Sequence, residues 1–138
     1  MQLDHFIVPA HSKSAAARRL GELLGVAWSE STDLGPFSPV YLNDGLTLDF
    51  VETTRPFPVH HYCFRVQQAE FDAILARIQA AGIAFRSTVQ GPVDMQVGRD
   101  YGNVYWNDPE GHQWEMLITS YARAPVDVKH PKKRAYRG

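Results

Sequence analysis

The sequence has a single cysteine, Cys63, among its 138 residues. One cysteine excludes a disulfide within the chain, which fits a reducing compartment. The sequence also lacks an apolar run approaching the roughly 18 to 20 residues that a membrane-spanning helix needs. Its first residues have neither the basic start nor the long apolar stretch of a signal peptide. We therefore expect a cytoplasmic protein.

The sequence also has no large excess of positive or negative charge. Lysine and arginine together number 14 and aspartate and glutamate 15, so the formal net charge is -1. This balance gives no reason to expect nucleic acid or a membrane surface as a partner. Basic residues gather only between Lys129 and Arg137, and we interpret 123–138 as a basic C-terminal tail. Residues 1–122 are then expected to form a single domain.

What the sequence does have is an internal repeat. His5 opens the apolar run HFIV, and His61 opens the similar run HYCF. Each run is followed by a helical pattern that ends in a glycine, and each half closes on a turn whose glycine precedes an acid by four residues. These acids are Asp49 and Glu115. Repeats of this kind fix an architecture, and here they predict two equivalent modules, about 1–54 and 59–122.

Each module is predicted to have the order β-α-β-β-β. In the first module we expect strands at 2–9, 26–31, 38–43 and 46–52, with a helix from about 12 or 14 to 24. In the second we expect strands at 60–67, 83–90, 101–107 and 112–119, with a helix at 69–81. Pro9 is expected to end the first strand, because proline cannot donate to a ladder. The predicted fold class is α+β, with two βαβββ modules forming a half-barrel around a shared cavity.

Strand alternation predicts which side chains share a face. It places His61 on the face opposite Tyr62 and Phe64, and Glu115 on the face opposite Trp114. If the helices cover the aromatic faces, His5, His61 and Glu115 line the inside of the curved sheets. Two histidines and one carboxylate are a donor set that holds a divalent metal with open positions. His60 is the competing ligand in the second half, although alternation turns it to the other face.

Three segments carry a resemblance to a known family: LDHFIV, HHYCFRV and GNVYWNDPEGHQWEML. They are similar to segments of the vicinal-oxygen-chelate superfamily, the glyoxalase/bleomycin-resistance/extradiol-dioxygenase group. The resemblance covers about residues 2–119. It implies paired βαβββ modules around a divalent ion such as Fe, Mn, Ni or Zn, with His5, His61 and Glu115 as ligands. It also implies catalytic roles for Asp49, at the position of a glutamate ligand and base, and for Tyr105.

The resemblance implies a metal-dependent lyase, isomerase or oxygenase acting on a small substrate that chelates through two oxygens. Ile7 stands where fosfomycin-resistance transferases of this superfamily have a threonine, which argues against that activity. The segment 91–100, with Asp94 and Arg99, is expected to be a lid or binding loop. We also expect a homodimer.

The alternative function is a metal-free binding protein of the bleomycin-resistance type. Three aromatic residues are the cavity candidates for that function: Phe50, Tyr105 and Trp106.

Overall fold

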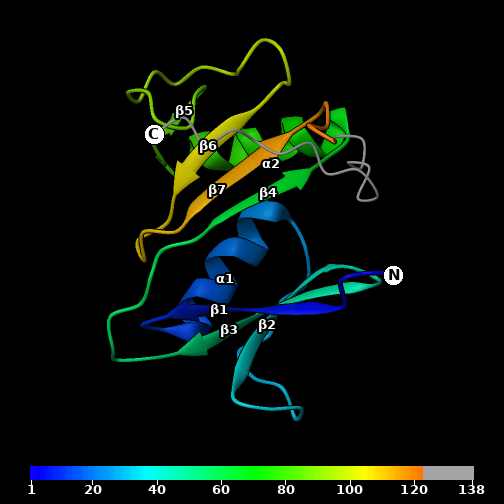
Figure 1. Cartoon of the computed structure of the whole chain (residues 1–138), viewed down its shortest axis with the longest axis vertical. Helices are drawn as coiled ribbons and strands as arrows, with labels where there is room; N and C mark the ends of the chain where they lie inside the picture. The colour runs from blue at the N-terminus through cyan, green and yellow to red at the C-terminus, as the bar shows by residue number, and fades with distance from the viewer. Residues whose placement is uncertain (123–138) are drawn as a thin grey trace, which may run out of the picture.

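The computed structural model describes residues 1–122, and its first module contains one helix and a three-stranded sheet (Figure 1). The elements are β1 (His5–Ala10), α1 (Lys13–Leu24), β2 (Phe37–Asn43) and β3 (Leu46–Glu52). The sheet order is β1-β3-β2, with β1 parallel and β2 antiparallel to β3. The strand expected at 26–31 is reduced to one bridge between Trp28 and Val40.

The second module repeats this plan with a four-stranded sheet. Its elements are β4 (His61–Arg65), α2 (Gln68–Ala80), β5 (Phe85–Arg86), β6 (Val104–Asn107) and β7 (Gln113–Leu117). The order is β4-β7-β6-β5, and β4 runs parallel to β7. The strand expected at 83–90 is shortened to the two residues of β5.

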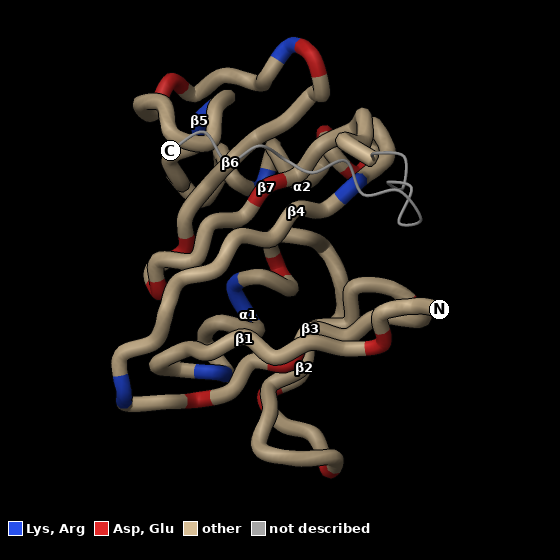
Figure 2. Tube along the Cα trace, in the orientation of Figure 1, with Lys and Arg blue, Asp and Glu red and all other residues tan. Residues whose placement is uncertain are grey.

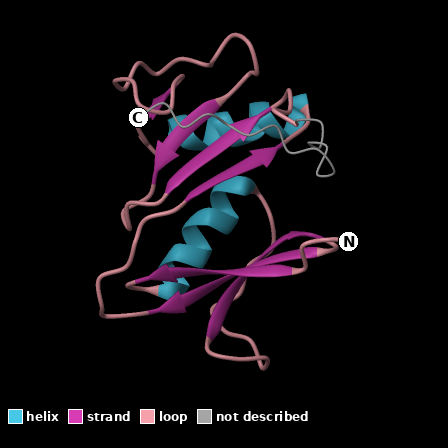
Figure 3. Ribbon diagram, viewed as in Figure 1, coloured by secondary structure: helices cyan, strands magenta, loops and turns pink. Residues whose placement is uncertain are grey.

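The predicted α+β class and the two half-barrel modules are confirmed. The two sheets stay separate among the described residues and do not close into a barrel (Figure 3). Lys and Arg residues and Asp and Glu residues are scattered over both modules in Figure 2. None of the helices in residues 1–122 has the length and apolar character to cross a membrane. The predicted basic tail, 123–138, lies outside the described residues.

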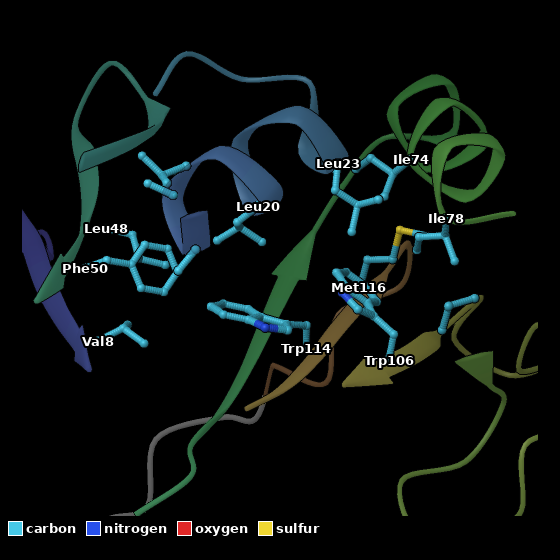
Figure 4. Close-up of a cluster of buried hydrophobic side chains, with 14 of the residues drawn as sticks. Val8, Leu20, Leu23, Leu48, Phe50, Ile74, Ile78, Trp106, Trp114 and Met116 are labelled. Carbon is cyan, nitrogen blue, oxygen red and sulfur yellow. The ribbon is translucent and has the colours of Figure 1, made fainter. Parts of the chain in front are cut away.

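Helix α1 is the central element of the core, because it packs against the first sheet and also contacts α2. Its apolar residues at helical spacing face the core, since Ala16, Leu20 and Leu23 are buried. The helix ends at Gly25, whose φ of 70° lies in the left-handed region where glycine is favoured. Figure 4 shows side chains from both modules meeting beside α1, so one continuous core joins the two halves.

The first strand begins and ends later than predicted. Pro9 does not end β1, which continues to Ala10, with Pro9 opposite Val51 of β3. The physical reason is that β1 is an edge strand. A proline there removes only a donor that would face away from the sheet, so the ladder to β3 is unaffected.

A buried histidine ties the two modules together. His112 is fully buried, and its Nδ1 accepts a hydrogen bond of 3.0 Å from the backbone N–H of His60. Its other ring nitrogen, Nε2, therefore carries the proton and donates to the carbonyl of Pro9 at 2.8 Å. Since Pro9 belongs to β1, this single imidazole links the first module to the second.

Replacing His112 with phenylalanine is expected to destabilise the chain by about 2 to 4 kcal/mol. An aromatic ring is kept, but two hydrogen bonds are lost, and the partly buried carbonyl of Pro9 and N–H of His60 are left unpaired at about 1 to 2 kcal/mol each. Urea unfolding measures the change. The control is His5→Ala, which removes an exposed histidine and should stay within about 0.5 kcal/mol of the parent. An equally small change for His112→Phe would contradict the proposed link.

Candidate active site

The second sheet has one face covered by the core and one open face. Tyr62, Phe64 and Trp114 pack on the covered side, where Phe64 and Trp114 stack at a centroid distance of 5.9 Å. Strand alternation then places His61 and Glu115 on the open side. The predicted facing of these two residues is confirmed.

His61 and Glu115 meet on this open face. The Nε2 atom of His61 lies 3.0 Å from Oε2 of Glu115, and the carboxylate is almost wholly buried, with 2% of its side chain exposed. Gln113 fixes the orientation of the ring. Its amide nitrogen donates to the carbonyl of Val89 at 3.0 Å, which turns its oxygen toward His61 Nδ1 at 2.6 Å. Nδ1 therefore carries a proton, and Nε2 is the atom presented to the carboxylate.

This contact suits a cation. Because Nδ1 already carries the proton, Nε2 and the carboxylate both present lone pairs to each other. A second proton, or a metal ion bound to both atoms, would make their contact favourable. Two ligands held at ~2.0 to 2.2 Å from one ion lie roughly 3 Å apart, which is the separation found here. A neighbour that orients the far nitrogen of the ring, as Gln113 does, is also typical of metal-binding histidines. The separation of His61 Nε2 and Glu115 Oε2 is therefore that of two ligands of one divalent ion.

The other carboxylate oxygen of Glu115 is held by two residues that the sequence analysis missed. Tyr121 donates its hydroxyl to Oε1 at 2.9 Å, and Asn103 Nδ2 lies 3.4 Å from the same atom. The Asn103 amide also donates to the hydroxyls of Tyr105 and Tyr121, at 2.8 and 2.9 Å. We call Glu115, Asn103, Tyr105 and Tyr121 the carboxylate cluster. Asn103 precedes β6 and Tyr121 follows β7. Tyr121 lies outside every expected strand, whereas alternation within the expected strand 101–107 puts Asn103 on the face of Tyr105 and could have identified it.

Burial keeps two tyrosine hydroxyls and one cysteine thiol near Glu115 protonated. Burial is the main cause of the raised pKa of Tyr105, to which the nearby carboxylate adds. The pKa of Tyr121 rises for the same first reason, with Tyr105 and Glu115 as further causes. Burial and then the charge of Glu115 also raise the pKa of the Cys63 thiol to about 12. Both phenols can therefore donate hydrogen bonds at neutral pH.

A cavity of about 620 Å³ adjoins the carboxylate cluster. Residues of the segment 87–101 form one wall, and Asn103, Tyr105 and Tyr121 belong to the other. Asp94 also lines this cavity, and its carboxylate accepts hydrogen bonds from the backbone and hydroxyl of Ser87. These bonds lower the pKa of Asp94. Arg99 lines the cavity and remains the cation of this segment that can contact an anionic group.

The remaining predicted site residues lie on the first sheet. His5 and Asp49 line a separate cavity of about 320 Å³, together with Tyr41 and Thr47. His5 is 58% exposed and hydrogen-bonds Asp4 at 2.7 Å, and this bond raises its pKa. Burial raises the pKa of Asp49, while the nearby His5 opposes that shift.

The structure thus brings two of the three predicted ligands together. His61 and Glu115 are in contact, whereas His5 accompanies Asp49 on the other sheet. Within residues 1–122, no three histidine, cysteine, aspartate or glutamate side chains form a group able to hold a metal ion. The competing residue His60 stacks on His112 at a centroid distance of 5.7 Å, away from Glu115.

Comparisons with solved structures identify the fold. The chain is similar to a protein named oxidase ChaP-H2, with 35% sequence identity, a TM-score of 0.80, and coverage of 88% of this chain and 95% of that one. A glyoxalase/dioxygenase from Nostoc punctiforme is 21% identical, with a TM-score of 0.64 and coverage of 86% and 91%. The antibiotic-binding protein TnmS3 from Streptomyces sp. CB03234 is also 21% identical, with a TM-score of 0.64 and coverage of 87% and 97%.

No protein-family model and no curated protein sequence matches the chain. The evidence for its family is therefore structural likeness over nearly its whole length, combined with 35% identity to a solved oxidase. The paired modules and the glyoxalase/dioxygenase neighbours agree with the segments LDHFIV, HHYCFRV and GNVYWNDPEGHQWEML. The chain belongs to the vicinal-oxygen-chelate superfamily, the glyoxalase/bleomycin-resistance/extradiol-dioxygenase group.

Proposed function

We propose that this chain is a divalent-metal-dependent enzyme of the glyoxalase/dioxygenase type that oxidises a small substrate chelating through two neighbouring oxygens. The observation that carries the proposal is the contact between His61 Nε2 and the buried Glu115 carboxylate, oriented by Gln113. Oxidation is favoured over isomerisation because the 35% identical relative is named an oxidase. Two histidines and one carboxylate with open positions also suit iron(II) oxygenase chemistry.

His5 is the proposed third ligand, supplied by a second copy of the chain. His5 lies on an edge strand and is half exposed, and Glu115 lies on the open face of the other sheet. The open face of the first sheet also leaves Ile7 and Tyr41 exposed by 50% and 44%. Exposed apolar side chains beside a polar group are typical of a surface that a partner covers. In a homodimer, the first sheet of one copy would face the second sheet of the other.

A bound divalent ion would polarise two adjacent substrate oxygens and, if it is iron, would also support reaction with dioxygen. The residues around it hold its ligands and the substrate. Tyr121 and Asn103 hold the carboxylate of Glu115 in place. Oε2 therefore stays directed at the position where a metal ion would also contact His61 Nε2. The hydroxyl of Tyr105, kept protonated by burial, donates a hydrogen bond to a substrate oxygen at the cavity wall.

Two further side chains would act on the substrate. Arg99 binds an anionic group of the substrate at the rim of the cavity beside the carboxylate cluster. Asp49 accompanies His5 across the dimer and accepts a proton from a chelating hydroxyl. A carboxylate in a partly buried position is a suitable general base for that step.

The activity is tested with catechols, hemithioacetals and fosfomycin plus glutathione, each with Fe(II), Mn(II), Ni(II) and Zn(II) in turn. With Fe(II), we expect oxygen uptake in the presence of a substrate that carries two vicinal oxygens. In His61→Ala, oxygen uptake should fall to the level seen with the metal alone. Turnover of a hemithioacetal without oxygen uptake would make the protein a glyoxalase-type isomerase. Failure to retain any metal, with no turnover, would favour a metal-free binding protein.

A further inference from the structure

A third cavity lies on the side of the second sheet away from Glu115. It has a volume of about 530 Å³, within the range of small-molecule sites. Trp106 lines it, and Trp106 alternates with Tyr105 along β6, so this cavity and the carboxylate cluster lie on opposite faces of one strand. Tyr105 and Trp106, both cavity candidates from the sequence, therefore belong to different sites.

The walls of this cavity come from both modules and are mostly apolar. Helix α1 and β3 contribute one side, and the end of α2, the segment after it and β6 contribute the other. Leu20 of α1, Phe50 of β3 and Trp106 of β6 line it together. The main apolar lining residues are Ala16, Leu20, Leu23, Phe50, Ile83 and Trp106.

One cation at this cavity has no acidic partner among residues 1–122. Arg19 is half buried and lines the cavity, whereas the adjacent Arg18 points elsewhere and pairs with Glu22 at 3.0 Å. The acid in the lining, Asp108, is already engaged. Its two oxygens accept hydrogen bonds from the backbone of His112 and from the indole of Trp114, at 2.9 and 3.0 Å.

A second donor in the lining is also free. The indole N–H of Trp106 forms no hydrogen bond within residues 1–122. Among these residues, Arg86 Nε is the only fully enclosed side-chain nitrogen or oxygen without a partner. The Trp106 N–H is therefore not sealed from solvent, and this cavity is the space that Trp106 lines. The neutral N–H of Trp106 and the cationic side chain of Arg19 thus border this mostly apolar cavity.

We propose that this cavity binds a small planar aromatic monoanion. The ring system packs between Leu20, Phe50 and Trp106, and the carboxylate pairs with Arg19. Burial of the ligand's ring system against the apolar walls provides affinity, and the ion pair between its carboxylate and Arg19 provides orientation. Because the lining spans both modules, binding also stabilises the folded chain. This site does not use His61 or Glu115, so it stands whether or not the proposed oxidation is right.

The test compares 2-naphthoate with its neutral analogue 2-naphthylmethanol by equilibrium dialysis against the full chain, with thermal unfolding as a second readout. We expect one naphthoate per chain, bound about tenfold more tightly than the alcohol, which is the scale of a charge-assisted hydrogen bond. Arg19→Gln should remove the preference for the acid. Arg18→Gln is the matched control and should keep it, as should His61→Ala.

Four outcomes would overturn the proposal. These are no binding of either compound, equal affinity of the parent for acid and alcohol, an effect of Arg18→Gln as large as that of Arg19→Gln, and loss of binding in His61→Ala. Far-UV circular dichroism of each variant separates loss of the site from loss of the fold.

Discussion

Replacing His61 with alanine is expected to abolish metal binding while leaving the fold intact. His61 is 41% exposed and lies on the open face of the second sheet, and within residues 1–122 its ring forms hydrogen bonds only with Gln113 and Glu115. Its removal should weaken metal affinity by more than about 100-fold, the upper effect of losing a residue that merely supports a ligand. Metal content after loading and dialysis measures the loss, and urea unfolding should change by less than about 1 kcal/mol.

His60→Ala is the matched control for this experiment. His60 adjoins His61 in the chain, but its ring packs against His112 and Tyr62 on the covered side. The variant should retain metal at the parental level. Equal metal loss in His60→Ala and His61→Ala would contradict the ligand assignment. Loss of folded protein in His61→Ala would instead make that residue structural.

The facing of individual side chains was predictable from the sequence, because strand alternation is a local property. It correctly separated His61 from Tyr62 and Glu115 from Trp114. The helices were also predictable, since each has an apolar stripe at helical spacing and a glycine near its end. The strand expected at 26–31 was not, because its only pairing is the single bridge from Trp28 to Val40.

The placement of the two sheets relative to each other could not be predicted from the sequence. A repeat indicates that His5 and His61 occupy equivalent positions, but it does not say whether the two modules present those positions to each other. That relation depends on how α1 packs in the shared core and on the buried link from His112 to Pro9. Tyr121 was missed because it lies outside the expected strands, whereas Asn103 was missed although alternation within the expected strand 101–107 places it on the face of Tyr105.

Mixing two inactive variants is expected to restore part of the metal binding. His5→Ala lacks the ligand from the first module, and His61→Ala lacks one from the second. If the site forms between chains, random exchange makes half of the dimers mixed, and each mixed dimer has one intact site of two. The metal content should therefore reach about one quarter of the parental level. Joint refolding of the two chains from urea, followed by metal analysis, measures this recovery.

The matched control is a mixture of His61→Ala and Glu115→Gln. Both changes fall in the second module, so no mixed dimer between them has an intact site, and metal binding should stay absent. Native mass spectrometry establishes that mixed dimers form in both experiments. If they form and metal does not return for His5→Ala with His61→Ala, His5 does not complete the site across the dimer. The proposed pairing of the two open faces would then be wrong, while the contact between His61 and Glu115 would stand unchanged.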